Sequence, residues 1–330
     1  MNKIFWFEEW TKGFKNYPFP TKAPFEKVSF YDEEKLKEAD AFVQIDIKPR
    51  RPKNHRRDRF YDYISSTGKP KLVFESHIFR QVILTQRYSR FAWNSYFNNV
   101  GYFGKLRNNP DRWKKFIEEE EIDIREPTQK KGDYILILTQ PTYGSCLNDL
   151  FDLYADSART DAPHYDRVYA EWLHRLVQYI QRYSELPIII RRHPAQKDIK
   201  FFNIKYFDNV YYSENTIGLK LEYGNSYLRT GGKHLTEEIL GSQAVVSWNS
   251  TGLVEAVCLG IPTFPLSPSS QCYPVGFRDL HDIDVIHRKK YPKRDEWFNN
   301  MAYCQWTDEE VKRGTAFRFI NDGYKSFLGY

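Results

Sequence analysis

Short, strongly apolar runs alternate with stretches of helical periodicity, and this alternation constrains the fold of the chain more than any other feature. In the second half, the strand-like runs are 134–139, 186–190, 243–247 and 261–264, and the helix-like stretches between them are 166–182 and 252–259. Continuously apolar strands separated by helices are typical of a parallel sheet that is covered on both faces. The sequence therefore predicts a doubly wound α/β structure.

The first half shows the same alternation, with strands expected at 41–47 and 71–75 and a charged helix at 113–120. A chain of 330 residues is long enough to form two hydrophobic cores. A polar, glycine-containing segment at 129–133 directly precedes the strand at 134. We therefore expect two lobes, 1–130 and 131–330. The amphipathic stretch 295–320 reads as a terminal helix that either braces the first lobe or only caps the second.

The formal net charge of +6 owes much to one basic run at residues 48–57. Such a run is typical of a solvated loop, and docking to an anionic membrane or polymer is the second interpretation. No known nucleic-acid-binding motif surrounds it, so we expect no nucleic-acid partner.

The four cysteines are widely spaced and form no CxxC pair, which predicts free thiols in a reducing compartment. The first residues include acidic side chains where a signal peptide needs an apolar stretch, and no apolar run reaches about 18 residues. The sequence therefore predicts a cytoplasmic protein, with peripheral contact at the inner membrane face through 48–57 as a further expectation.

One candidate binding segment follows the strand at 186–190 and reads Arg191-Arg192-His193-Pro194. Ligands of open α/β sheets bind beyond the carboxyl ends of the strands. Two guanidinium groups and an imidazole at such an end can neutralise a phosphate, and Pro194 would fix the turn that orients His193. A basic surface turn is the alternative.

A second candidate segment follows the strand at 243–247 and contains Asn249, Ser250 and Thr251 before a helix begins at Gly252. Hydroxyl side chains and exposed backbone N–H groups at a helix start attract an anion. Ser250 or Thr251 could instead serve only as a helix N-cap. Glu255 is placed to accept a hydrogen bond from a ribose or sugar hydroxyl, or is a solvated helix carboxylate.

Together these segments resemble the nucleotide-binding lobe of GT-B glycosyltransferases, and more closely the capsular polysaccharide family of Kdo transferases and related bacterial sialyltransferases. The resemblance implies two Rossmann-like lobes whose parallel sheets face a central cleft. In that family a His-Pro motif and a Ser/Thr-rich helix start hold the CMP part of the donor. The donor-binding residues expected here are Gln140, Arg191, His193, Pro194, Asn249, Ser250, Thr251 and Glu255.

The first lobe carries a related resemblance at residues 73–80, which look like that family's strand ending in Glu-Asp-Gly, an apolar pair and Arg. Glu75 and Arg80 match this pattern, whereas Ser76 and His77 do not. A carboxylate that follows a buried strand and faces the cleft is a candidate general base. We predict that Glu75 or His77 is this base; an ion pair with an arginine is the alternative for Glu75.

Residues 134–145 resemble the strand, Gln and short loop that carry an Asp in retaining Kdo transferases. Gln140 matches the family's Gln, but Gly144 stands where the Asp is expected. A double displacement needs a nucleophile on the enzyme. The chain is therefore expected to invert by direct attack, to use another carboxylate such as Asp149, or to take a different donor. Segments 90–94 and 304–310 also resemble capsule-synthesis relatives of unassigned substrate.

The predicted function is transfer of a sugar from a nucleotide donor to a glycan or glycolipid acceptor in surface polysaccharide synthesis, with a CMP-linked acid sugar such as Kdo favoured. We expect no separate cofactor and no metal. Asp282 and Asp284 formally match a metal-binding Asp-x-Asp motif, but their late position favours a turn cap. A sugar-nucleotide 2-epimerase, which needs no acceptor, and a catalytically inactive carbohydrate-binding relative are the alternatives.

Overall fold

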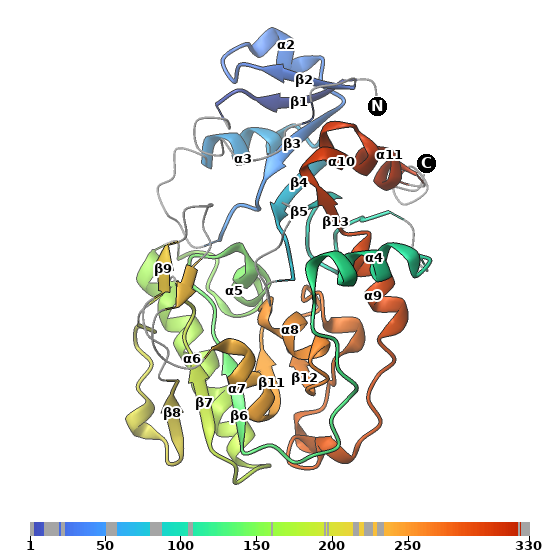
Figure 1. Ribbon diagram of the computed structural model, residues 1–330. Helices are drawn as coiled ribbons and strands as arrows, with labels where there is room; N and C mark the ends of the chain where they lie inside the picture. Colours follow the sequence, from blue (N-terminus) through green and yellow to red (C-terminus); the bar gives the residue numbers. More distant parts are fainter. Residues whose placement is uncertain are drawn as a thin grey trace.

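The computed structural model describes most of the chain. The described residues are 3–9, 20, 24–50, 58–79, 88–104, 108–159, 161–194, 196, 198–213, 218–220, 227–229, 234–322 and 324. Two sheets lie one above the other in the view of Figure 1, with helices packed around them.

The first sheet has six strands in the order β13-β5-β4-β3-β1-β2. They are β1 (Ile4–Phe7), β2 (Phe25–Val28), β3 (Ala41–Ile45), β4 (Lys71–Ser76), β5 (Tyr88–Trp93) and β13 (Gln305–Thr307). Neighbours from β2 to β4 pair in parallel. β5 runs antiparallel to both β4 and β13, so this sheet is mixed rather than wholly parallel.

Two helices accompany the first sheet, α2 (Glu33–Lys37) and α3 (Asp58–Ser66). The apolar side of α3 contributes Phe60 and Ile64 to a cluster with Phe5, Phe7 and Phe42 of the strands. Burial of these large side chains on the sheet holds α3 in place, since the helix is otherwise polar.

The second sheet is entirely parallel, in the order β12-β11-β6-β7-β8. Its strands are β6 (Tyr134–Leu138), β7 (Ile188–Arg191), β8 (Val210–Tyr212), β11 (Ser242–Ser247) and β12 (Thr263–Pro265). The helices around it are α5 (Asn148–Tyr154), α6 (Ala162–Gln181), α7 (Leu235–Gly241) and α8 (Gly252–Cys258). A separate antiparallel pair joins β9 (Gly218–Lys220) and β10 (Tyr227–Arg229).

Both faces of the second sheet are buried, as the continuous apolar runs predict. In β6, Ile135 and Ile137 pack in the cluster that contains α5 and α6, whereas Leu136 and Leu138 pack in the cluster that contains α8. Successive side chains of a strand point to opposite faces, so the sheet carries one core on each side. The predicted doubly wound arrangement is confirmed.

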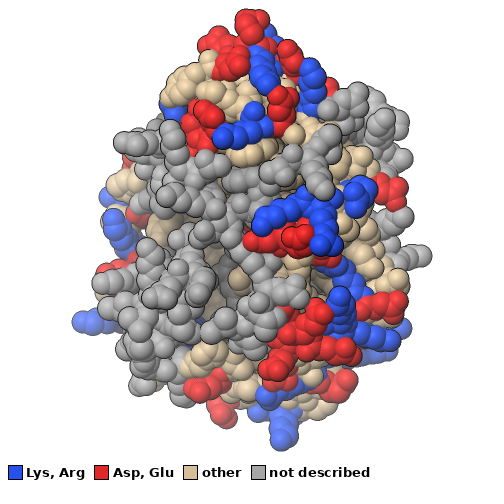
Figure 2. Space-filling model, turned by 45° about the horizontal axis from the view of Figure 1, so that its top comes forward, with Lys and Arg blue, Asp and Glu red and all other residues tan. Residues whose placement is uncertain are grey.

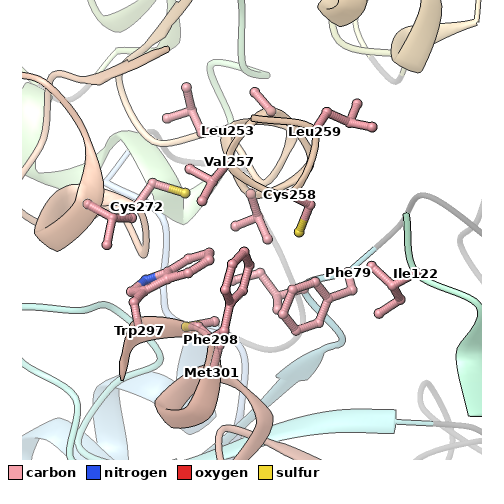
Figure 3. Packing of buried hydrophobic residues seen from close by; sticks show 14 of the residues in the cluster. Phe79, Ile122, Leu253, Val257, Cys258, Leu259, Cys272, Trp297, Phe298 and Met301 are labelled. Carbon is pink, nitrogen blue, oxygen red and sulfur yellow. The ribbon is translucent and has the colours of Figure 1, made fainter. Parts of the chain in front are cut away.

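Figure 3 shows the cluster that surrounds α8. Val257 and Cys258 of α8 face Trp297 and Phe298, and Phe79, which follows β4, reaches the same cluster. Trp297 and Phe298 belong to α9 (Asp295–Ala302), which also packs on α4 (Asp111–Glu120). The rings of Trp113 and Phe298 stack there with their centroids 4.8 Å apart. This cluster therefore combines residues from both sides of position 131, and the position of the lobe boundary stays a prediction.

The stretch expected to form one terminal helix is instead divided into α9, β13, α10 (Asp308–Lys312) and α11 (Thr315–Asn321). Thr307 starts α10 with a reciprocal capping box to Glu310. Gly314, with φ of 75°, separates α10 from α11. These elements return to the first sheet (Figure 1), where Val311 and Ile320 join the cluster formed by its strands.

Short 3₁₀ helices occupy several loops of the second half. They are η1 (Ser145–Leu147), η2 (Ile204–Tyr206), η3 (Tyr273–Val275), η4 (Leu280–Asp282) and η5 (Ile286–Arg288).

Figure 2 shows Lys and Arg side chains beside Asp and Glu side chains at the top of the molecule and along its right side. Around α2, Lys35 pairs with Glu26 and Lys37 with Glu34. Within the described ranges, no helix has both the length and the apolar character needed to cross a bilayer. All four cysteines are described and are free, as predicted.

Candidate active site

The carboxyl end of β3 meets the loop that follows β6, which brings the two sheets into direct polar contact. Asp46 comes directly after β3, and its backbone N–H donates to the carbonyl of Phe74 at 2.9 Å. Because Ile45 is the register partner of Phe74, Asp46 lies next to Glu75 at the end of β4. Two carboxylates therefore lie side by side at the carboxyl edge of the first sheet.

One carboxylate oxygen of Asp46, Oδ1, accepts three hydrogen bonds. The donors are the backbone N–H of Ile47 at 2.6 Å, the hydroxyl of Ser145 at 3.0 Å and the hydroxyl of Tyr96 at 3.1 Å. The hydroxyls of Tyr96 and Ser145 also hydrogen-bond to each other. Since Ser145 lies in η1, this network links the first sheet to the loop that carries Gly144.

Asp46 has a strongly altered proton affinity. Burial, and then the negative charge of Glu75, raise the pKa of Asp46 to about 7, while its three hydrogen bonds act in the opposite direction. A carboxyl group with a pKa near neutrality is suited to accept and release a proton at physiological pH.

Glu75 lies directly opposite Arg90 in the antiparallel ladder of β4 and β5. Side chains at directly opposed positions lie on the same face of the sheet and within contact range. Arg90 is 5% exposed, and its guanidinium lies over the ring of Tyr96, 4.7 Å from the centroid. This register supports the ion-pair alternative for Glu75.

His77, the other predicted base, follows β4 and is partly buried. The next residue is fixed by a hydrogen bond from the backbone N–H of Ile78 to Oε1 of Gln305, at 3.1 Å. Arg80, which completes the family-like pattern, lies outside the described residues.

Gly144 precedes η1 in an ordinary extended conformation, with φ of −86°. A Cβ at this position would lie 3.0 Å from Sγ of Cys146 and 3.2 Å from the carbonyl oxygen of Pro141. The loop is therefore tightly closed around the position where the family-like pattern expects Asp.

Asp149, considered as a replacement nucleophile, is engaged at both carboxylate oxygens. Oδ1 accepts from Nε1 of Trp248 at 2.6 Å and from the backbone N–H of Leu150 at 3.0 Å, and Oδ2 accepts from the hydroxyl of Ser267. These bonds tie α5 to the segments that follow β11 and β12. The arrangement is that of a structural anchor.

Gln140 clamps the candidate donor loop to the end of β6. Its Nε2 donates to the carbonyl of Asn249 at 2.5 Å, and its Oε1 accepts from the backbone N–H of Asn249 at 3.0 Å. Among the described atoms, Nδ2 of Asn249 is buried and has no hydrogen-bond partner. Ser250 Oγ accepts from the N–H of Gly252 at 3.2 Å, whereas Thr251, at the N-cap position, makes no side-chain cap bond.

Arg191 is buried, at 3% exposed, and forms an ion pair with Glu238 of α7. The hydroxyl of Ser213 donates to the same carboxylate. Burial lowers the pKa of Arg191, and the charges of Glu238 and Glu255 oppose that effect. Glu255 is itself only 5% exposed, so the interpretation of Glu255 as a solvated helix carboxylate is wrong.

The other residues of the basic turn differ in how exposed their side chains are. Arg192 lies over the ring of Tyr212 at 4.8 Å and pairs with Asp198 at 3.6 Å. His193 is partly buried and Pro194 is exposed. The structure thus separates the guanidinium of Arg191, inside, from that of Arg192, near the surface.

The Asp-x-Asp segment lies in a structural turn. Asp282 pairs with Lys289 at 2.9 Å, and Asp284 pairs with Lys131 at 3.3 Å. The cap of the turn is Asp279, which accepts from the N–H of His281, rather than Asp282. In the described part of the chain, no group of three or more His, Cys, Asp and Glu side chains is arranged to hold a metal ion.

Sequence reasoning missed Asp46, Tyr96 and Ser145. The rule that ligands bind beyond the carboxyl ends of strands selected residues after β7 and β11, and it applies equally to β3. The strand expected there extended to residue 47, so Asp46 was placed inside the strand and not after it. The observed strand ends at Ile45, and Asp46 adopts φ of 62°. A strand predicted to end at Ile45 would have placed Asp46 at its carboxyl end and identified it as a candidate site residue.

No family model matches the sequence, and no curated protein does so either. Solved structures do match. The beta Kdo 2,4 transferase of KpsC from Thermosulfurimonas dismutans has a TM-score of 0.50 at 12% identity, covering 91% of this chain and 89% of that one. The beta Kdo 2,7 transferase of the same protein has a TM-score of 0.49 at 12% identity, with coverage of 97% and 99%. The wall teichoic acid polymerase TagF has a TM-score of 0.23 at 10% identity, with coverage of 100% and 90%.

At such identities the likeness is one of fold, and the match at a TM-score of 0.50 carries it. The α/β architecture with facing lobes that the sequence predicts is confirmed: the chain has a GT-B-like fold.

Proposed function

We propose that this chain is a glycosyltransferase that moves a sugar from a nucleotide donor to a glycan or glycolipid acceptor in surface polysaccharide synthesis. One observation carries the proposal. Asp46, which lies beside Glu75 at the carboxyl edge of the first sheet, accepts a hydrogen bond from Ser145 in the loop after β6, and Gln140 of the same loop clamps the segment at Asn249. Acceptor-activating groups and a donor loop at facing sheet edges are what sugar transfer needs.

The proposed donor is CMP-linked, with Kdo or another acid sugar, and its phosphate contacts His193, Asn249, Ser250 and Thr251. Asn249 supports this assignment because its buried side-chain nitrogen has no hydrogen-bond partner among the described atoms. Catalysis would then rest on positioning and on stabilisation of the leaving phosphate.

We assign the four other predicted donor-side residues a supporting role in this proposal. Arg191 of β7 and Glu255 of α8 are buried, and Gln140 fixes the loop backbone. Pro194 shapes the exposed turn after His193.

The proposal extends to a cytoplasmic location with contact to anionic membrane through 48–57. Residues 51–57 of this run lie outside the described part of the chain. Lys48 and Arg50 pair with Asp62 and Asp152, at 2.5 and 2.7 Å. Co-sedimentation with phosphatidylglycerol vesicles but not with phosphatidylcholine vesicles tests this membrane contact.

The test of the donor site is a thermal-shift panel of CMP, UDP, GDP and dTDP. A ligand that binds only the folded state stabilises it by about 2.7 kcal/mol at 100 times its Kd. We expect CMP to raise the melting temperature, and the variants His193→Ala and Asn249→Ala to abolish the rise. The matched control is His281→Ala, because His281 is exposed on η4.

If no nucleotide stabilises the protein, the donor-site proposal fails. If a nucleotide does stabilise it, the next step is to incubate the corresponding sugar nucleotides with enzyme alone. An epimerised donor formed without acceptor would replace the transferase proposal with the epimerase.

A further inference from the structure

We propose that Asp46 is the general base that deprotonates the acceptor hydroxyl, held in position by Tyr96 and Ser145 where the edge of the first sheet meets the loop after β6. The proposal rests on the transferase function proposed above. It replaces Glu75 and His77 in the role of base.

The two oxygens of Asp46 are used differently. Oδ1 accepts from the backbone N–H of Ile47 and from the hydroxyls of Tyr96 and Ser145. The side-chain hydrogen bonds that Asp46 accepts from the described residues all go to Oδ1 and none goes to Oδ2, and Asp46 is only partly buried. One oxygen is therefore fixed while the other is left to receive a proton, which is the geometry that a general base needs.

The charged and titratable groups around Asp46 favour proton uptake. Burial, and then the charge of Glu75 alongside it on β4, raise the pKa of Asp46 to about 7. Tyr96 and Cys146 both have raised pKa values, so neither adds negative charge near neutral pH. Arg90 from β5 is turned to the ring of Tyr96 and lies opposite Glu75.

Glu75 is the poorer candidate for the base because of this same arrangement. Its register partner is the buried Arg90, so the carboxylate of Glu75 is placed for an ion pair within the sheet rather than for contact with an acceptor hydroxyl. Glu75 instead supplies the charge that increases the proton affinity of Asp46. In this mechanism it is a positioning residue.

The chemical step is a direct displacement. The acceptor O–H gives its proton to Oδ2 of Asp46 as the acceptor oxygen forms a bond to the anomeric carbon. The bond between that carbon and the phosphate oxygen breaks, and its electron pair leaves with the nucleotide. Asp46 ends as a neutral acid and returns the proton to water. A single displacement inverts the anomeric configuration, which agrees with the glycine at position 144.

The first arm of the test measures proton binding and needs no substrate. Carboxyl ¹³C resonances of aspartate-labelled protein are followed across pH 4–9 for the unsubstituted protein and for Asp46→Asn. We expect one resonance with a midpoint near 7, and its absence from the variant. If no such resonance belongs to Asp46, the proposal is overturned.

The second arm measures turnover. Release of CMP from CMP-Kdo and CMP-N-acetylneuraminic acid is measured with and without glycan acceptors, alongside CMP binding. Asp46→Asn should bind CMP normally and lose turnover by about 10²- to 10⁴-fold, the range for general bases. Tyr96→Phe should shift the acidic limb of the pH–kcat profile to a higher pH, because it removes one donor to the carboxylate. Asp62→Asn, an exposed aspartate, is the matched control.

The outcomes separate the two proposals. Absence of binding by every nucleotide overturns the transferase function, while the titration still decides the state of Asp46. Normal binding with full turnover by Asp46→Asn overturns only the base. A retained anomeric configuration, or a sugar found covalently attached to Asp46 by mass spectrometry, also overturns it.

Discussion

Asp46 has two energetically unfavourable features. Its backbone is left-handed, with φ of 62°, and its carboxyl group is partly buried beside another carboxylate. Asp is one of the few side chains that tolerates this backbone region. The surrounding hydrogen bonds, including one from Nε2 of Gln44 to the carbonyl of Asp46 at 2.7 Å, hold the conformation. Strain held in this way concentrates at functional sites.

Asp46→Asn should change how stability depends on pH. The folded-state pKa of about 7 lies above the ordinary value of 3.8, so the folded protein binds more protons than the unfolded chain between those values. The stability contributed by this carboxyl is full at low pH and is lost as pH rises toward 7, by at most about 1.4 kcal/mol per pH unit. Urea unfolding at pH 5 and pH 8 should therefore show the variant gaining stability relative to the unsubstituted protein at pH 8. Equal differences at both values would contradict this.

At the residue scale, the sequence was informative wherever a strand end was correctly placed. Gln140 and Asn249 do lie together, joined by a two-point clamp. The buried ion pair of Arg191 was not predictable because its partner, Glu238 of α7, comes from a separate segment of the chain. A local sequence pattern does not identify a partner that comes from a distant segment.

The ion pairs within and between elements differ widely in their exposure to solvent. The ion pair between Arg191 of β7 and Glu238 of α7 leaves each side chain only 3% exposed. The pair between Arg313 and Glu309, in contrast, leaves 71% and 61% exposed. Removing one member of a buried pair strands the other charge, whereas exposed pairs contribute little.

Glu238→Met should therefore destabilise the protein by roughly 3–5 kcal/mol in urea unfolding. The double variant Arg191→Met/Glu238→Met should recover much of that loss, because no uncompensated charge remains. Glu309→Met, the exposed control, should stay within about 1 kcal/mol. A loss in the double variant as large as in the single one would show that the charges themselves are not the cause.

At the element scale, continuous apolar runs predicted β6, β7, β11 and β12 well because strands buried on both faces have a distinctive composition. The break of the terminal stretch was harder to predict. The amphipathic pattern persists from α9 to α11, while the capping box at Thr307 and the positive φ of Gly314 interrupt the backbone. Periodicity alone does not detect such breaks.

Across the whole molecule, the closing elements return to the strands formed by the beginning of the chain. Gln305 of β13 pairs with Arg90 of β5, so the segments 90–94 and 304–310, singled out separately from the sequence, include partner strands. Arg112 of α4 reinforces this return. It bonds both carboxylate oxygens of Glu310, at 2.6 and 2.9 Å, and the carbonyls of Ala302 and Gln305.

Arg112→Lys should loosen this attachment although it keeps the charge. An ammonium cannot reproduce the planar, two-point contact, and hydrogen bonds to charged groups contribute roughly 1.5–3 kcal/mol each. We expect lower stability in urea and faster proteolysis after residue 300. Arg125→Lys, whose partner Asp123 is exposed, is the control. Unchanged proteolysis in Arg112→Lys would contradict the role assigned to Arg112.

The two-lobed architecture was predictable at this scale because it follows from the order of strands and helices. The mixed character of the first sheet was not, because the direction of β5 and the addition of β13 depend on pairing between distant segments. A hydropathy pattern indicates which residues are buried, but it does not indicate which strands are neighbours in the sheet.

The position of β13 has a consequence for how the protein is made. Without this strand, β5 is the edge of the first sheet and presents unpaired backbone groups. A nascent chain exposes that edge until residues 305–307 have left the ribosome, and such edges are sites where chains associate wrongly. Late synthesis of this three-residue strand therefore leaves β5 as an open sheet edge until residues 305–307 are available to pair with it.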